Sequence, residues 1–283
     1  MDLQPIFSIL PPELSSAAAR LDTSRLEELR LRTGQIPAAF VCGQERPFPG
    51  SPEPVTSRML EEILSAATGH SCYSAEETLR EGFVTLPGGH RIGLCGTAAV
   101  QNGSVRAIRS VSSLCIRIAR QLPTAPPELV RRLRVSTLIL GSPGSGKTTL
   151  LRDCVRRLSN GGQRVCIVDE RGELAACLHG RPQLDVGTHT DVLTGCPKAA
   201  GIPLLLRGMR PDWIAVDEIT APEDIRVMEQ ASHCGVRFLA TAHAYGRDEL
   251  QKRPLYRGLC ELEIFKTLWL LTPERQVREE RMD

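Results

Sequence analysis

A glycine-rich segment in the middle of the chain holds the residues best suited to chemistry. It fits the pattern G-x-x-x-x-G-K-[ST] in full and lies between an apolar run, TLIL, and a helix-compatible run, TTLLRDCVRRL. Its members are Gly141, Ser142, Pro143, Gly144, Ser145, Gly146, Lys147 and Thr148. Glycines let successive backbone N–H groups converge on phosphate oxygens, and the start of the helix adds its positive end. The segment therefore predicts a phosphate-binding loop, against the alternative of a flexible Gly/Ser turn before an ordinary helix.

In such a loop Lys147 reaches the β- and γ-phosphates, and Thr148 ligates Mg²⁺ through its hydroxyl. Only four of the 35 basic residues are lysines, so Lys147 stands out against an arginine-based surface. The chain has no N-K-x-D segment of the kind that selects guanine, which argues against a GTPase. The expected ligand is therefore ATP with Mg²⁺.

Two acids follow a second apolar run. Trp213-Ile-Ala-Val216 leads directly into Asp217 and Glu218. An acid at the end of a buried strand beside the loop's strand can hold the hydration shell of Mg²⁺, and a second acid can polarise the attacking water. We assign Asp217 to the metal and Glu218 to the general base. An apolar strand followed by two acids also arises by chance, so this assignment depends on the phosphate-binding loop.

Other polar residues are expected near the same edge. The run Asp169-Glu170-Arg171-Gly172-Glu173 closes the strand after the loop's helix, although it would equally suit a charged helix start. Arg207 and Arg210 precede the Asp217 strand and suit phosphate-sensing arginines or fingers that reach a neighbour's nucleotide. The alternative for both arginines is a solvated helix face.

A histidine follows the next apolar run. The order Thr241-Ala242-His243 places Thr241 and His243 near the γ-phosphate side of the predicted sheet. A histidine there could sense hydrolysis by bonding the water or the phosphate, and a satisfied loop histidine is the alternative.

These residues need a parallel sheet to position them. From residue 130 onward apolar runs alternate with Gly-rich turns and helix-compatible segments, which predicts an α/β domain with helices on both faces and ligands at the carboxyl ends of its strands. Leu259–Phe265 and Thr267–Leu271 are expected to add edge strands. The four main strands are expected at Thr137–Leu140, Val165–Val168, Trp213–Val216 and Val236–Thr241.

Residues 1–122 predict a smaller α+β domain. Its expected elements are extended runs at Leu26–Arg32 and Ala38–Val41, a helix at Thr56–Ala67, a hairpin of Phe83–Leu86 with Arg91–Cys95, and a strand within Ala107–Ala119. A proline-rich linker is expected at residues 123–129, because prolines break both helices and ladders. The ATP-binding domain then spans residues 130–283.

Composition excludes several classes of protein. The 283 residues carry a net charge of +2, 41% hydrophobic residues and 4% aromatic residues, which offers no strong field or stacking platform for nucleic acid. The ten cysteines form no C-x-x-C pair, so free buried thiols in a reducing cytosol are expected rather than a zinc site. No signal peptide and no run of about 18 apolar residues is visible, and we expect a cytoplasmic protein.

The chain resembles the stage III sporulation protein AA ATPases of endospore-forming Firmicutes, which are relatives of the type II and type IV secretion ATPases. The resemblance covers nearly the whole chain. Its most specific stretches are GSPGSGKTTLLRD, IVDERGELA, PQLDVGTHTDVLTGCPKAAG, LLRGMRPDWIAVDEI and TAHA, with GFVTLPGGHRIGLCGTA and SSLCIRIAR nearer the N-terminus. The implied fold is a P-loop NTPase domain of the RecA-like, secretion-ATPase-like kind, with a smaller N-terminal domain for subunit or partner contacts.

The resemblance also implies roles for residues. By position, Gly144, Gly146, Lys147, Thr148 and Thr149 are implied to bind nucleotide, and Asp217 and Glu218 to form the Mg²⁺ and hydrolysis pair. Glu170 and Arg171 resemble the acidic-box residues of secretion ATPases, and Arg207, Arg210 and His243 resemble their arginine and histidine elements. Thr220-Ala221-Pro222 departs from the Gly or Arg that relatives place there, so a basic contact at that point is in doubt.

The sequence and the resemblance lead to one functional hypothesis with two alternatives. The hypothesis is a cytoplasmic ATP-hydrolysing motor of the mother cell, assembled as a ring of six, that energises a membrane channel complex to the forespore. One alternative is a nucleic-acid-dependent ATPase that uses the arginines of 117–120 and 131–134, and the small net charge weakens it. The other is an assembly scaffold that binds nucleotide without useful hydrolysis.

Overall fold

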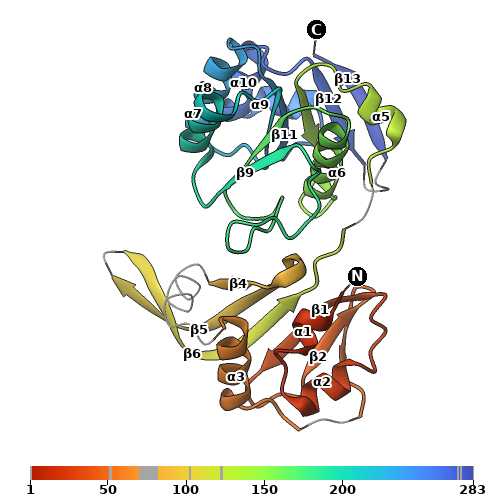
Figure 1. Ribbon diagram of the computed structural model, residues 1–283, viewed down its shortest axis with the longest axis vertical. Helices are drawn as coiled ribbons and strands as arrows, with labels where there is room; N and C mark the ends of the chain where they lie inside the picture. Colours follow the sequence, from red (N-terminus) through yellow and green to blue (C-terminus); the bar gives the residue numbers. More distant parts are fainter. Residues whose placement is uncertain are drawn as a thin grey trace. The chain divides into compact units, whose positions relative to one another are not determined.

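The chain folds into two compact units, Met1–Arg120 and Gln121–Asp283. They are drawn in Figure 1 from a computed structural model, which describes residues 2–50, 53–69, 82–101, 103–121, 124–272, 274 and 276–282. Each unit has its own sheet and its own hydrophobic core. In the described part of the chain no helix is both long and apolar enough to cross a membrane.

The N-terminal unit is built on an antiparallel sheet. Its strands are β1 (Leu26–Arg32), β2 (Ala38–Val41), β3 (Gln44–Pro47), β4 (Phe83–Thr85), β5 (Arg91–Gln101) and β6 (Ser104–Arg117), in the order β3-β2-β1-β6-β5-β4. The helices among its described residues are α1 (Gln4–Phe7), α2 (Pro12–Ala18) and α3 (Ser57–Ala67). The alternation in β1 buries Leu29 and Leu31 against the core while its charged residues stay nearer solvent.

Most sequence predictions for this unit are confirmed. The extended runs at Leu26–Arg32 and Ala38–Val41 are strands, and the expected hairpin joins β4 to β5 through a short 3-10 turn at Pro87–Gly89. The strand expected within Ala107–Ala119 is part of the longer β6, which pairs with β5 along a ribbon that reaches Gln101.

The C-terminal unit is an α/β layer structure, as predicted. Its strands are β7 (Thr137–Leu140), β8 (Val165–Asp169), β9 (Thr190–Thr194), β10 (Trp213–Val216), β11 (Arg237–Ala242), β12 (Thr267–Leu271) and β13 (Val277–Arg281), in the order β13-β12-β7-β11-β10-β8-β9. Its helices are α5 (Pro127–Arg131), α6 (Lys147–Asn160), α7 (Lys198–Met209), α8 (Pro222–Ser232), α9 (Arg247–Lys252) and α10 (Pro254–Glu261). All neighbouring pairs are parallel except β12 with β13.

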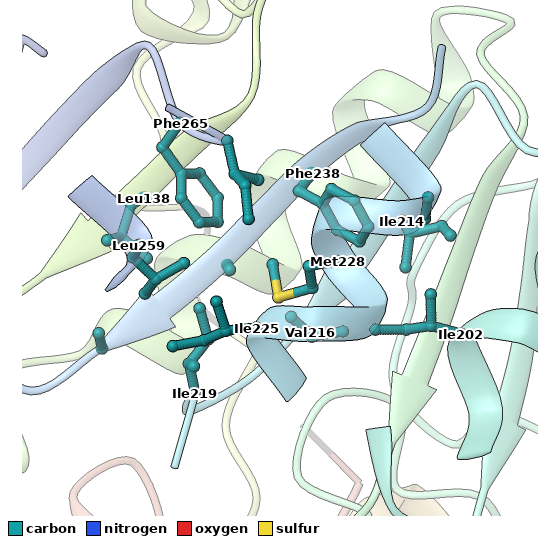
Figure 2. Packing of buried hydrophobic residues seen from close by; sticks show 14 of the residues in the cluster. Leu138, Ile202, Ile214, Val216, Ile219, Ile225, Met228, Phe238, Leu259 and Phe265 are labelled. Carbon is teal, nitrogen blue, oxygen red and sulfur yellow. The ribbon is translucent and has the colours of Figure 1, made fainter. Parts of the chain in front are cut away.

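Helices cover both faces of this sheet. Alternate side chains of β10 point to opposite faces, so Ile214 and Val216 join the cluster beneath α7–α10 while Trp213 and Ala215 join the cluster beneath α5 and α6. Figure 2 shows the first cluster, in which Met228 of α8 packs among strand and helix side chains. A sheet buried on both faces explains why its central strands are almost wholly apolar.

The order of the strands corrects one expectation. The strand of Asp217, β10, does not lie beside β7, the strand before the phosphate-binding loop, because β11 lies between them. The register aligns Ala240 of β11 with Val216 of β10 and with Leu138 of β7. Thr241, near the end of β11, therefore lies between the glycine-rich loop that follows β7 and the two acids that follow β10.

Other sequence predictions for this unit were wrong in part. Leu259–Phe265 is not a strand, because Pro254 opens helix α10 and this helix buries Tyr256 and Leu259 on one side. Thr267–Leu271 is a strand, but it is paired on both sides rather than at an edge. The short strands β9 and β13 were not predicted.

The expected linker and thiols also need correction. Residues 122 and 123 lie outside the described residues, and Pro127 opens helix α5, so the last part of 123–129 is helical. The described cysteines are free thiols, as expected, and Cys154 and Cys166 are buried. Cys42, Cys95 and Cys234 are exposed, against the expectation of burial. Cys72 lies outside the described residues.

The packing of Met228 gives a stability prediction. Met228 is fully buried, so Met228→Ala should lower the free energy of unfolding of the C-terminal unit by about 2–5 kcal/mol. Urea unfolding followed by tryptophan fluorescence measures this, because Trp213 and Trp269 are the chain's two tryptophans and both are buried in this unit. Arg226→Ala, an exposed site on the same helix, is the control and should change it by less than about 0.5 kcal/mol. A loss below about 1 kcal/mol for Met228→Ala would contradict the tight packing.

Candidate functional site

The glycine-rich segment forms the turn between β7 and α6. Gly146 precedes the helix with φ of 100°, a conformation that favours glycine, and has no side chain to cap the first turn. Gly141 lies so close to the turn that an added Cβ would meet Ser145 Oγ at 2.8 Å and the Leu271 carbonyl oxygen at 3.2 Å. The helix N-terminus therefore presents its free N–H groups at the carboxyl edge of the sheet.

Lys147 is buried within this turn. Its ammonium group donates to the carbonyl oxygens of Gly141, at 2.9 Å, and Ser142, at 2.8 Å, and to His243 Nδ1, at 3.0 Å. Burial lowers the pKa of Lys147, and the charges of Asp217 and Glu218 act in the opposite direction. The three ammonium hydrogens therefore have three acceptors, all of them neutral groups.

His243 joins the lysine to the predicted base. Because an ammonium group can only donate, His243 Nδ1 accepts from Lys147, and in the neutral ring Nε2 then carries the hydrogen. Nε2 lies 3.1 Å from Glu218 Oε1. The histidine predicted near the γ-phosphate side thus bridges Lys147 and Glu218.

Asp217 meets the loop across the intervening strand. Thr148, in the first turn of α6, donates its hydroxyl hydrogen to Asp217 Oδ2 at 2.8 Å. The other carboxylate oxygen, Oδ1, accepts from the Thr241 hydroxyl at 2.5 Å. The structure therefore brings Thr148 and Asp217, the two residues predicted to hold Mg²⁺, into direct contact.

Glu218 follows in an unusual backbone conformation. Its φ of 54° lies in the left-handed region, which is uncommon for a residue with a side chain. Its backbone N–H donates to Thr241 Oγ1 at 2.7 Å, and its carboxylate also pairs with Arg171 Nη1 at 2.5 Å. Backbone conformations of this kind persist when the surroundings hold them, and they cluster at functional sites.

The run that follows β8 has divided roles. Asp169 is buried and accepts backbone N–H groups from Glu173, Leu174 and Ala175, so this acid fastens the loop. Glu170 pairs with the buried Lys198 of α7 at 2.5 Å. Of this run, Arg171 reaches the predicted active site, where it contacts Glu218.

Arg207 and Arg210 are not brought to this edge. Both are exposed at the end of α7, and Arg210 comes three residues before β10 begins. Because β10 is parallel to its neighbours and Asp217 follows its carboxyl end, these arginines lie at the opposite edge of the sheet. This position does not support a phosphate-sensing role toward the chain's own nucleotide, and a role toward a neighbour's nucleotide stays a prediction.

Thr241 is the residue whose importance the sequence did not reveal. It was expected near the γ-phosphate side, but no role was assigned to it. It is fully buried and contacts both Asp217 and Glu218. Threonine is common in strands, so the sequence gives no signal for Thr241. Knowledge that β11 lies between β7 and β10 would have been needed to find it.

The residues present fit a nucleotide with Mg²⁺. Ser145 Oγ is buried within the loop and has no hydrogen-bond partner there, and the helix N-terminus is uncapped. Mg²⁺ in nucleotide sites is typically held by one or two carboxylates together with the substrate phosphates. Asp217 supplies such a carboxylate and Thr148 a hydroxyl beside it, and among the described residues no cluster of three or more His, Cys, Asp and Glu side chains offers another metal site.

Comparisons with solved structures agree with this fold. The ATPase DotB of Legionella pneumophila has a TM-score of 0.60 and 18% sequence identity over 98% of this chain and 80% of its own. A structure of the pilus retraction motor PilT with bound ADP has a TM-score of 0.61 and 15% identity, covering 91% of this chain and 76% of its own. At these identities the likeness shows the fold alone, that of a secretion-ATPase-like P-loop protein.

Comparisons of sequence give the family. The chain is 38% identical over 274 residues to Stage III sporulation protein AA of Bacillus subtilis (strain 168), covering 92% of this chain and 88% of that protein. It is 27% identical to the Arabidopsis thaliana Protein SEEDLING PLASTID DEVELOPMENT 1, of which it covers 35%. The profile of the family described as Sporulation stage III, protein AA matches residues 5–280. This chain therefore belongs to the Sporulation stage III, protein AA family.

Proposed function

We propose that this protein hydrolyses ATP with Mg²⁺ as a motor of the secretion type, and that it energises a channel complex between mother cell and forespore. The observation that carries the proposal is the contact of the Thr148 hydroxyl with the Asp217 carboxylate, beside Lys147 and Glu218. A strand-loop-helix that places a lysine and a hydroxyl close to two acids suits phosphoryl transfer to water. Membership of a sporulation family supports the cellular setting.

In this proposal each residue has a stated task. The loop Gly141–Thr149 binds the phosphates, Lys147 turns from its carbonyl partners to the β- and γ-phosphates, and Thr148 and Asp217 hold Mg²⁺. The metal would neutralise charge on the phosphate oxygens. Glu218 accepts a proton from the attacking water, and His243 and Arg171 hold its carboxylate until nucleotide binds.

The proposal includes assembly into a ring, most simply of six subunits, in the mother-cell cytoplasm. Arg207 and Arg210 support a shared site, because they are exposed far from the chain's own phosphate-binding loop and are accompanied by the exposed apolar side chains of Leu204 and Met209. An arginine at such an edge can stabilise phosphate charge only on a nucleotide held by another subunit. Glu170, paired with Lys198, is proposed to support the loop that holds Arg171.

The first test separates binding, hydrolysis and assembly. Lys147→Ala should abolish nucleotide binding, whereas Glu218→Gln should bind MgATP and lose hydrolysis by roughly 100-fold or more, because the base is removed. Sedimentation of Glu218→Gln with and without MgATP should show an ATP-dependent ring that is absent for Lys147→Ala.

Three results would each contradict a part of this proposal. If Glu218→Gln hydrolyses ATP as the wild type does, Glu218 is not the base. If nucleotide binds and the chain stays monomeric at every accessible concentration, the ring is wrong. Unchanged support of sporulation by Glu218→Gln would instead favour a nucleotide-dependent scaffold.

The second test asks whether Arg210 acts across a subunit boundary. Arg210→Ala should bind ATP normally and hydrolyse it slowly, because its own loop is intact and its neighbour's arginine is missing. Mixing it with Glu218→Gln, which retains Arg210 and is expected to bind MgATP and assemble, should restore hydrolysis above that of either variant alone, measured by phosphate release. Mixing it with the double variant Glu218→Gln/Arg210→Ala is the control, and equal rates in the two mixtures would exclude a role in trans.

A further inference from the structure

Thr241 lies at the carboxyl end of β11, between the strand of the phosphate-binding loop and the strand of the two acids. The register pairs it with Ile139 of β7, while the preceding Ala240 pairs with Val216 of β10. Its side chain is fully buried. A buried hydroxyl between apolar strands needs hydrogen-bond partners, and in this place its partners belong to the site.

Both hydrogen-bonding capacities of the hydroxyl are used on the two acids. The hydroxyl donates to Asp217 Oδ1 at 2.5 Å and accepts the backbone N–H of Glu218 at 2.7 Å. These directions are fixed, because a carboxylate accepts and an N–H donates. One oxygen atom of Thr241 therefore sets the carboxylate of Asp217 and the backbone of Glu218 at the same time.

The main chain of Thr241 completes this attachment. Its carbonyl oxygen accepts the N–H of Ile219 at 3.0 Å, and the Ile219 carbonyl in turn accepts the Tyr256 hydroxyl at 3.2 Å. Two consecutive N–H groups, of Glu218 and Ile219, are thus bound by one residue. They flank the left-handed backbone of Glu218, which brings both within reach of Thr241.

The bond to Asp217 also decides which oxygen is offered to the loop. Because Thr241 occupies Oδ1, Oδ2 is the oxygen that meets the Thr148 hydroxyl. A group that orients a metal-ligating carboxylate in this way typically tunes metal affinity and activity although it does not touch the metal.

We propose that Thr241 is a positioning residue that couples the metal-side acid to the general base, so that Asp217 and Glu218 are set as one unit. The inference rests on the proposed function, because it assigns Mg²⁺ and water activation to these acids. The inference goes beyond the proposed function because it assigns the positions of both acids to the hydroxyl of Thr241, a neutral group on a third strand that does not itself bind the metal.

The experiment removes the hydroxyl while keeping the shape of the side chain. In Thr241→Val, Asp217 Oδ1 and the Glu218 N–H lose their shared partner, and in Thr241→Ser the hydroxyl is kept and a methyl group is lost. Thr137→Val is the matched control, because Thr137 is a buried threonine of β7 whose hydroxyl bonds the Val135 carbonyl at 3.0 Å, at the opposite end of the strand.

Four quantities are measured on the full chain. They are the dissociation constant of a fluorescent ATP analogue in EDTA and in Mg²⁺, the Mg²⁺ concentration for half-maximal binding enhancement, kcat, and urea unfolding by tryptophan fluorescence. For Thr241→Val we expect kcat to fall and the half-maximal Mg²⁺ concentration to rise, each by roughly 10- to 100-fold. The affinity in EDTA should stay within about 2-fold of the wild type, since the loop that binds the phosphates is intact. Thr241→Ser should recover most of the loss, and Thr137→Val should behave as the wild type.

Two outcomes would overturn the inference alone. One is a Thr241→Val variant with wild-type Mg²⁺ dependence and kcat, and the other is a Thr241→Ser variant as impaired as Thr241→Val, which would make the effect one of packing. If Thr241→Val does not fold, Thr241→Ala compared with Thr241→Ser decides by the same readouts. If the wild type binds the analogue no better than Lys147→Ala, the proposed function itself fails and the inference fails with it.

Discussion

The interposition of β11 between β7 and β10 is the constraint on which the site depends. Neighbouring strands lie about 4.8 Å apart, so the phosphate-binding loop and the acid-bearing strand start roughly 10 Å from one another. Side chains cover that distance. Thr148 lies at the start of α6 and Thr241 lies on β11, between the two strands. Both donate a hydroxyl hydrogen bond to the carboxylate of Asp217. The parallel direction of the three strands makes this possible, because it collects their carboxyl ends at one edge.

The charged groups at the carboxyl edge of the sheet have different kinds of hydrogen-bond partner. Lys147 is surrounded by neutral acceptors, whereas Glu218 is paired with Arg171 and contacts His243. Buried charged side chains stabilise the loop that contains Arg171 by hydrogen bonds to its backbone. Asp169 accepts three of its backbone N–H groups, and the buried Arg152 of α6 donates to the carbonyls of Glu173 and Leu174. A buried ion that satisfies backbone groups in this way is stable because its hydrogen bonds replace those it had with water.

The sequence predicted those parts of the site whose chemistry requires unusual residues at fixed spacing. The spacing of Gly141, Gly146 and Lys147 has few alternative explanations, and Gly146 has the positive φ that this spacing requires. Two acids after an apolar run indicate the end of a strand. Thr241 has no such signature, because threonine is common in strands for reasons of packing. The strand expected at Leu259–Phe265 failed for a related reason. Its apolar residues suit a strand or one face of a helix equally well, and Pro254, which starts α10, decides between them. The position of Arg210 could have been predicted, because in a parallel sheet with Asp217 at the carboxyl end of β10 a residue that precedes this strand lies at the opposite edge.

The three acceptors of Lys147 have a thermodynamic consequence. An ammonium group has three hydrogens, and all three are already given to Gly141, Ser142 and His243. In the proposed function a phosphate oxygen can gain this cation only by exchange, so the enthalpy of nucleotide binding would be the difference between two sets of hydrogen bonds. The turn is closed on itself here, and the proposed function requires a second state in which it is opened onto a ligand. The dissociation constant expected for such a site includes the free energy needed to open the closed state, as it does for any receptor that must rearrange before it binds.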